Sequence, residues 1–405
     1  MNNTKKTLIV PMLIMASMFS VLGFAVGIDA FFIPFVKKAF GISNTLSYLV
    51  FFATYASFVL FSVPAGLLMK RIGYRGGMVA GFVFLALSFL LIALASHWFS
   101  YPLFLGALFV NGMGRVALNA AVNPYVTILG PRESAARRIC MMGISNKVSY
   151  AAASLILAMF LNLADVRLED TVLPFYLIAA IVLVMGILSR FAPLPELKAE
   201  GEENKGDDKL PDHVAVANTK TSMLQFPHLI GGVVAYFFYT GVEVTALGSI
   251  NHYAGVLGLN NPQHYVWFTS GAMVAGYITG VALIPKFISQ IAALRMSALA
   301  GLLFCMAIVL SPAQISIYFL ALLGLANALI LPAIWPLSLA DLGKFTKPAS
   351  GLLVTGGLGG GIIPLLYGFT VDTIHSSQWA YLVCLPSYII ILYFGTKGYK
   401  IRTAN

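Results

Sequence analysis

Long apolar stretches, separated by short polar segments, are the main pattern along the chain. Each stretch has roughly 20 residues or more, the length that an α-helix needs to cross a bilayer. Twelve stretches of this kind occur, six on each side of a longer polar segment. They fall near residues 8–36, 46–69, 76–96, 100–128, 138–162, 172–192, 225–253, 265–287, 291–310, 314–340, 346–371 and 377–396.

The apolar residues run together and do not alternate with polar ones, as 85–95 and 176–188 illustrate. Alternation is typical of membrane β-barrels, so continuous runs favour helices, which satisfy their own backbone hydrogen bonds in lipid. We therefore predict an all-α polytopic membrane protein, with 12 transmembrane helices in two pseudo-symmetric six-helix bundles. The first bundle would cover residues 1–192 and the second 225–405. The segment between them, 193–224, mixes acidic and basic residues and is predicted to be a solvated cytoplasmic linker.

Composition and charge support this class of protein. The chain is 59% hydrophobic and 10% charged, with a mean hydropathy of +0.87, whereas soluble domains carry about 25% charged residues. Most of the 25 Lys and Arg residues lie on the same side of the predicted spans as the N-terminus; the other side holds only Lys37, Lys38 and Arg167. Basic residues gather on the cytoplasmic side of membrane proteins. We expect an inner-membrane protein in contact with lipid, with both termini cytoplasmic and no nucleic-acid partner.

Four ionisable residues lie inside predicted spans: Asp29, Arg115, Lys147 and Glu243. Charge within a membrane is costly and therefore usually functional. Asp29 could accept hydrogen bonds from sugar hydroxyls, bind a coupling cation, or pair with Arg115. Glu243 occupies the matching place in the second half, because 241–243 (Gly-Val-Glu) resembles 27–29 (Gly-Ile-Asp). It could carry a proton or bind Na⁺.

The two basic residues allow different interpretations. Arg115 needs a carboxylate at this depth, and Asp29 and Glu243 are the deep candidates. Alternatively, its guanidinium could bind an anionic substrate. Lys147 could extend toward the cytoplasm or face a cavity.

Polar side chains near Arg115 form a stripe. Arg115, Asn119 and Asn123 are spaced four residues apart and share one helix face. Amide side chains of this kind bind sugar hydroxyls, so we predict a substrate site here. Additional candidate ligands, for which hydrogen bonding between helices is the alternative, are Asn146, Asn251, Asn327 and Trp335.

Four motifs give the chain a resemblance to a known family. Residues 64–75 resemble the loop between spans two and three of the major facilitator superfamily, with Lys70 in place of the usual acidic residue. That change is typical of the branch containing the fucose permease and the glucose/galactose transporters. Residues 123–131, 339–351 and 359–372 also resemble that branch. The resemblance implies a symporter of sugar and cation.

Several positions differ from the fucose permease. Asn119 stands where that permease has an acidic residue, and Gly143 where the family has glutamine. Ala30 stands at the position of its first-span aspartate, with Asp29 one residue earlier, while the family asparagine is kept as Asn146. These differences separate this chain from the fucose permease itself.

The sequence thus predicts a cation-coupled importer of a hexose such as glucose or galactose, driven by H⁺ or Na⁺ and working by alternating access. The alternative is an importer of an N-acetylated or acidic sugar; a drug exporter agrees less well with the asparagine stripe. No GxxxxGK[ST] motif is present, which excludes an ATP-driven pump of that type. We expect no enzymatic activity, no metal and no cofactor beyond the coupling ion, and a monomer.

Overall fold

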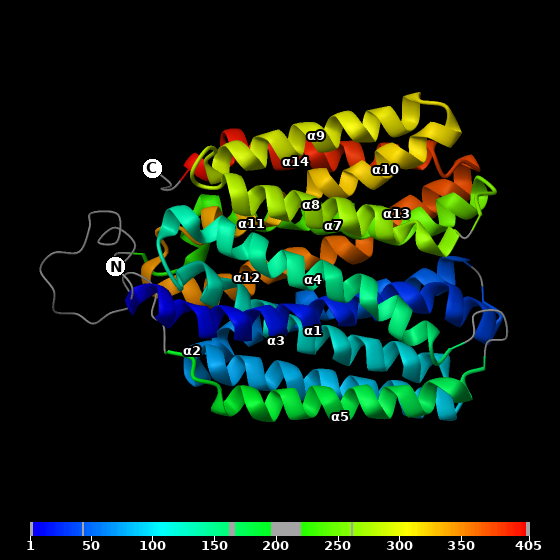
Figure 1. The fold of residues 1–405 in the computed structure, drawn as a ribbon, viewed down its shortest axis with the longest axis horizontal. Coiled ribbons are helices and arrows are strands. Elements are labelled where there is room, and N and C mark those ends of the chain that lie inside the picture. The colour runs from blue at the N-terminus through cyan, green and yellow to red at the C-terminus, as the bar shows by residue number, and fades with distance from the viewer. Residues whose placement is uncertain (1–2, 43, 162–166, 196–219, 261, 402–405) are drawn as a thin grey trace, which may run out of the picture.

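The computed structural model describes residues 3–42, 44–161, 167–195, 220–260 and 262–401, and these are almost entirely helical. The long helices run side by side along one axis, and α1 begins at the end of the bundle where α14 ends (Figure 1). We refer to this end as the terminus end. The helices are α1 (Asn3–Phe40), α2 (Asn44–His97), α3 (Tyr101–Ile128), α4 (Ala135–Ala158), α5 (Glu169–Phe191), α7 (Pro227–Val256), α8 (Val266–Leu283), α9 (Gln290–Leu310), α10 (Ala313–Asn327), α11 (Ile330–Leu339), α12 (Thr346–Thr355), α13 (Gly359–Ile374) and α14 (Leu385–Thr396). Short 3₁₀ turns are η1 (Arg132–Ser134), η2 (Met223–Gln225), η3 (Pro262–His264), η4 (Gly343–Phe345), η5 (Gly356–Leu358), η6 (Trp379–Cys384) and η7 (Gly398–Lys400).

All twelve predicted spans coincide with helical segments among the described residues. Ten segments there are long and apolar enough to cross a membrane, and one of them, Leu49–His97, has 49 residues. That segment holds two predicted spans, because Gly73 interrupts α2 with a φ of 70° that favours glycine. The less apolar α4, with 24 residues, coincides with the fifth predicted span. The prediction of an all-α membrane protein is confirmed.

Two of the predicted spans are interrupted near their middle. The tenth consists of α10 and α11, and the eleventh of α12, the 3₁₀ turn η5 and α13. The eleventh runs through the glycine-rich stretch 356–361, where a Cβ at Gly359 would overlap the carbonyl oxygen of Phe237 in α7. Small residues therefore let α7 and α13 approach closely. Breaks of this kind position backbone and side chains at the centre of a membrane protein.

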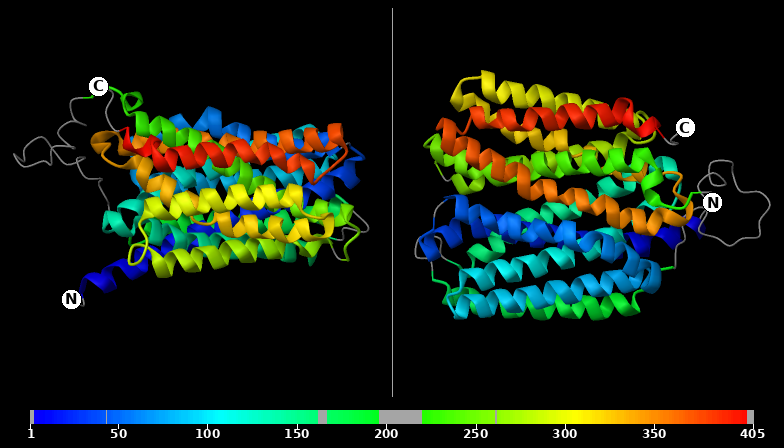
Figure 2. Two further views of the ribbon diagram at one scale, coloured as in Figure 1. Left: turned by 90° about the horizontal axis from the view of Figure 1, so that it is seen from above. Right: turned by 180° about the vertical axis from the view of Figure 1, so that it is seen from behind.

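The helices form two layers, α1–α5 and α7–α14 (Figure 2). Between the layers α2 contacts α12 and α13, and α4 contacts α8. Gly66 and Gly351 allow the α2–α12 contact, because a Cβ on Gly351 would lie 2.8 Å from the Cα of Gly66. The predicted bundles 1–192 and 225–405 include these layers, and most of the predicted linker, 196–219, lies outside the described residues.

Polar contacts join the two layers at the terminus end. Arg132 in η1 forms an ion pair of 2.8 Å with Asp341. Gln290 at the start of α9 donates to the carbonyl oxygens of Arg132 (3.0 Å) and Glu133 (3.3 Å), and its Oε1 accepts from the backbone N–H of Ala136 (3.3 Å). The layers are therefore closed against each other at this end.

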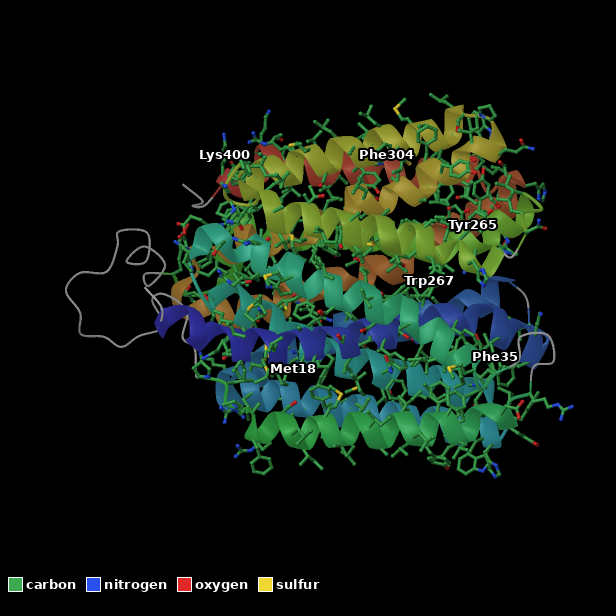
Figure 3. The ribbon with its side chains drawn as sticks, in the orientation of Figure 1. Met18, Phe35, Tyr265, Trp267, Phe304 and Lys400 are labelled. Atoms are coloured by element: carbon green, nitrogen blue, oxygen red, sulfur yellow. The ribbon has the colours of Figure 1, made fainter. Side chains whose placement is uncertain are left out.

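Apolar side chains cover the outer faces of the bundle. Leu173 and Leu188 of α5 and Leu303 of α9 are largely exposed. Charged side chains such as Lys400 lie at the terminus end (Figure 3). A surface that is apolar along the helices and charged at their ends agrees with a position in lipid.

Candidate functional site

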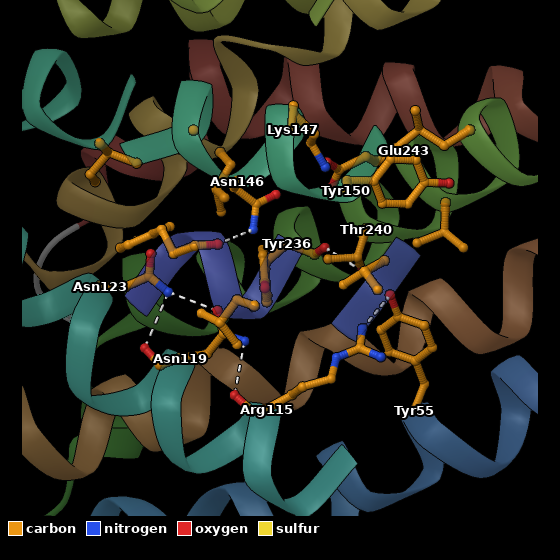
Figure 4. Close-up of a pocket in the computed structure, with 18 of the residues that line it drawn as sticks. Tyr55, Arg115, Asn119, Asn123, Asn146, Lys147, Tyr150, Tyr236, Thr240 and Glu243 are labelled. Atoms are coloured by element: carbon orange, nitrogen blue, oxygen red, sulfur yellow. Dashed lines mark hydrogen bonds and ion pairs between the residues drawn. The ribbon is translucent and has the colours of Figure 1, made fainter. Parts of the chain in front are cut away.

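A pocket lies between the two layers, beside the middle of α3 and α7 (Figure 4). The first layer contributes residues of α1, α2, α3 and α4, and the second contributes residues of α7, α8 and α11. The lining residues are Phe19, Leu22, Val26, Phe51, Tyr55, Phe58, Arg115, Asn119, Asn123, Ile139, Gly143, Asn146, Lys147, Tyr150, Tyr236, Thr240, Glu243, Val244, Leu247, Tyr277 and Leu331. Six of the predicted ligands and charges line it together: Arg115, Asn119, Asn123, Asn146, Lys147 and Glu243.

Arg115 is held by an ion pair within the first layer. Its Nη1 lies 2.5 Å from Asp29 Oδ2, and the two side chains are 3% and 1% exposed. Its Nη2 donates to the hydroxyl of Tyr55 at 3.0 Å. The guanidinium carbon also lies 4.9 Å from the centre of the Tyr55 ring, within the range of a cation–π contact.

The prediction that Arg115 requires a deep carboxylate is confirmed, and Asp29 supplies it. Asp29 does not line the pocket but lies behind Arg115. In this arrangement it positions and neutralises the guanidinium, while Arg115 itself faces the cavity. The first oxygen of Asp29, Oδ1, is buried with no hydrogen-bond partner among the described residues.

A second ion pair crosses the pocket. Lys147 Nζ of α4 lies 2.5 Å from Glu243 Oε1 of α7, and the side chains are 8% and 13% exposed (Figure 4). The ammonium lies 5.6 Å from the centre of the Tyr150 ring. The interpretation in which Lys147 extends toward the cytoplasm is wrong, because the Glu243 carboxylate on the opposite layer holds it in the cavity.

The asparagine stripe lines the pocket as a hydrogen-bonded chain. Asn119 donates to the carbonyl oxygen of Arg115 at 2.9 Å, and Asn123 donates to both side-chain and backbone oxygens of Asn119 at 3.0 and 3.1 Å. From α4, Asn146 donates to the carbonyl oxygen of Phe19 in α1 at 3.0 Å. These bonds fix the amide planes, which keeps one N–H of Asn119 and one of Asn146 available for a ligand.

The comparisons with known proteins agree with this architecture. The sequence profile of the Major Facilitator Superfamily matches residues 13–353. The chain is 30% identical over 395 residues to a glucose/galactose transporter of Brucella abortus biovar 1 (strain 9-941), covering 95% of this chain and 92% of that one. The chain belongs to the Major Facilitator Superfamily.

Other members are similar over nearly their whole length. The L-fucose-proton symporter of Escherichia coli (strain K12) is 25% identical over 415 residues, covering 96% of this chain and 93% of that one. The crystal structure of the facilitator FucP in the outward conformation has a TM-score of 0.77 at 24% identity, covering 96% and 98% of the two chains. The proton:xylose symporter XylE has a TM-score of 0.74 at 12% identity, covering 94% of each. These two structures show that the fold is the facilitator fold, as the sequence predicted. The family match and the relatives named as transporters show that the protein is a transporter and not an enzyme.

In addition to Asp29, three predicted ligands lie outside the pocket. Asn327 is fully buried and its Oδ1 accepts from Tyr388 at 2.9 Å, while Asn251 Oδ1 accepts from the backbone N–H of Val266 at 2.9 Å. Trp335 is fully buried with its ring 5.6 Å from that of Tyr236. These contacts connect helices or helix ends, the alternative that the sequence left open for single polar residues.

Sequence reasoning missed the tyrosines that line the pocket. Tyr236, Thr240 and Glu243 share one face of α7 at spacings of four and three residues, which is the signal that could have found them. The ring of Tyr277 lies beside Gly143, where a Cβ would be 2.6 Å from Cε1. The glycine that replaces the family glutamine therefore makes room for this ring.

No three His, Cys, Asp or Glu side chains in the part of the chain described are grouped closely enough to hold a metal ion. The two carboxylates at the site, Asp29 and Glu243, each have a basic partner. The chemistry that the site offers is hydrogen bonding to a polar ligand and exchange of a proton or cation at a carboxylate.

Proposed function

We propose that this protein imports a neutral hexose such as glucose or galactose together with a proton, by alternating access. Relatives named as glucose/galactose transporters and L-fucose-proton symporters align with nearly the whole chain, which supports this substrate class. The two layers would rock about the pocket so that it opens to one side of the membrane at a time.

The observation that carries the proposal is a pocket between the layers with planar polar side chains and balanced charge. Asn119, Asn123 and Asn146 offer amide groups suited to sugar hydroxyls. Arg115 faces the cavity already neutralised by a carboxylate. An acidic sugar would have to displace Asp29 from this pair, so a neutral sugar suits the pocket better. Aromatic rings, Tyr150 among them, offer faces for the C–H groups of a sugar.

The orientation follows from charge. We infer that the terminus end faces the cytoplasm, because Arg71, Arg75, Arg132 and Lys344 belong to segments at this end, and basic residues concentrate on the cytoplasmic side. The contacts of Gln290 and Arg132 close the layers there, which favours loading of the pocket from the other side.

The test is uptake by the purified full-length protein in proteoliposomes. Radiolabelled D-glucose, D-galactose, L-fucose, N-acetylglucosamine and glucuronate would be offered under an imposed pH gradient and, separately, an imposed Na⁺ gradient. We expect concentrative uptake of glucose or galactose with the pH gradient, and loss of that uptake in Asp29→Asn and Glu243→Gln. Uptake of glucuronate alone would replace the hexose with an acidic sugar, and uptake with the Na⁺ gradient alone would replace the proton.

A further inference from the structure

The two buried ion pairs at the pocket differ in which parts of the molecule they connect. Asp29 and Arg115 belong to α1 and α3 of the same layer, whereas Lys147 and Glu243 belong to α4 and α7 of opposite layers. Alternating access moves one layer against the other. The first pair can therefore persist through the cycle, but the second has to change when the layers separate at this level.

We propose that Lys147 couples proton binding to sugar binding, an inference that rests on the proposed function. Without substrate, its ammonium occupies the Glu243 carboxylate at 2.5 Å. When a sugar enters and a proton binds to Glu243, the ammonium leaves the carboxyl group and donates its hydrogen bonds to oxygens of the sugar. Lys147 keeps its own protons throughout, and the proton that is transported is the one on Glu243.

The coupling follows from the cost of leaving a buried charge unpaired. A proton on Glu243 in the empty pocket would leave Lys147 without a carboxylate, and removal of one partner from a buried ion pair is strongly unfavourable. The Tyr150 ring, 5.6 Å away, compensates only weakly. A sugar without a proton would have to compete with Glu243 for the ammonium. Each ligand thus removes the cost of binding the other, and the two affinities rise by the same factor.

The surroundings of Glu243 leave this role to Lys147. The one other cationic side chain that lines the pocket, among the described residues, is Arg115, and it is already paired with Asp29. No second carboxylate lines the pocket within the same residues. The helices α10, α12, α13 and α14 also contact α7 but add no residue to the lining as described. The remaining titratable side chains of the lining are the tyrosines Tyr55 of α2, Tyr150 of α4, Tyr236 of α7 and Tyr277 of α8. Tyr239 of α7 is buried beside Glu243 but does not line the pocket.

The experiment compares four proteins in proteoliposomes: wild type, Lys147→Met, Lys147→Arg and Glu243→Gln. The probe is D-glucose or D-galactose, whichever of the two wild type transports. Two quantities are measured: proton uptake evoked by adding the sugar, and exchange of labelled for unlabelled sugar at equal concentrations without a gradient. The matched control is Lys400→Met, which also removes a lysine, but at the terminus end and far from the pocket. Sugar binding is also measured between acidic and alkaline pH.

We expect Lys147→Met to bind the sugar more weakly, because the ammonium no longer donates to sugar oxygens, but still to exchange it at saturating concentration. Sugar-evoked proton uptake should fall by about tenfold or more. The sugar affinity of this variant should no longer depend on pH, because no ammonium remains for which the sugar and the Glu243 carboxylate could compete. Glu243→Gln should lose the coupling in the same way. Lys147→Arg and Lys400→Met should keep both activities. Wild-type proton uptake in Lys147→Met would overturn the inference. Loss of exchange even at saturating sugar in the folded variant would also overturn it, since Lys147 would then act as a sugar ligand alone.

A failure of the proposed function has a different signature, because wild type itself would then exchange no hexose or evoke no proton uptake. If Lys147→Met does not fold, the variant with Lys147→Glu and Glu243→Lys together restores the ion pair in reversed order. We expect this variant to fold and to couple sugar binding to proton binding, with the carboxyl group at position 147 carrying the proton. A folded reversed variant without sugar-evoked proton uptake would overturn the inference.

Discussion

Replacing Asp29 by asparagine tests whether the pair with Arg115 is a structural requirement of the site. Asparagine keeps the shape of the side chain and one acceptor oxygen but removes the charge. In this structure Arg115 has a side chain 3% exposed, with Nη1 2.5 Å from Asp29 Oδ2. The substitution would therefore leave a guanidinium buried without its counter-charge.

The magnitude follows from burial. Removing one partner of a buried ion pair costs roughly 3–5 kcal/mol, because the other charge is left in a low-dielectric site. We expect Asp29→Asn to lie at the lower end, about 3 kcal/mol, because asparagine still accepts a hydrogen bond. Arg115→Met should cost a similar amount, with an additional loss of about 1 kcal/mol for the hydrogen bond to Tyr55.

The assay is equilibrium unfolding of the purified protein in mixed micelles by titration with a denaturing detergent, followed by tryptophan fluorescence. Both single variants and the variant that carries both substitutions complete a double-mutant cycle. The pair Arg132–Asp341 is the control, because its side chains are more exposed, at 53% and 17%. Asp341→Asn should change the free energy of unfolding by less than about 1 kcal/mol. Asparagine also tolerates the left-handed backbone at this position, where φ is 61°.

The double variant decides the interpretation. With both charges absent, no unpaired ion remains, so its destabilisation should be smaller than the sum of the two single losses by about 1–3 kcal/mol. Strict additivity would refute the reasoning, since it would mean that the two side chains contribute to stability independently.

Three further predictions concern contacts between helices. Gly143→Ala should impair folding and reduce hexose uptake severalfold, since its Cβ would lie 2.6 Å from the ring of Tyr277. Adding Tyr277→Ala to the same chain should restore the folded peak in size-exclusion chromatography. Gly351→Ala should lower the thermal unfolding temperature, because its Cβ would meet the carbonyl oxygen of Ser62 at 2.6 Å; an unchanged temperature would show that α2 and α12 can separate freely. Gln290→Ala should weaken closure of the layers at the terminus end. In a protein that carries Ala136→Cys, it should raise the rate at which thiol reagents label that cysteine; equal labelling with and without Gln290→Ala would contradict this.

Much of the fold follows from local properties of the sequence. Apolar stretches of membrane length must be helical because lipid offers no hydrogen-bond partner to an exposed backbone. Their number, their approximate positions and the division of 44–97 into two spans could therefore be predicted from the residues alone. The mid-span breaks between α10 and α11 and at η5 could not, because they depend on the close approach of neighbouring helices such as α7.

The site divides in the same way. Asp29, Arg115, Lys147 and Glu243 could be recognised from the sequence because charge in an apolar span is costly wherever its partners lie. Which charges pair was decided by tertiary structure: periodicity assigns a residue to a helix face, but not to the helix that this face meets. The sequence therefore allows two interpretations of Lys147, and its ion pair with Glu243 of α7 decides between them. Asn327 and Trp335 have the same polarity as true lining residues, and only the packing of their helices places them outside the pocket.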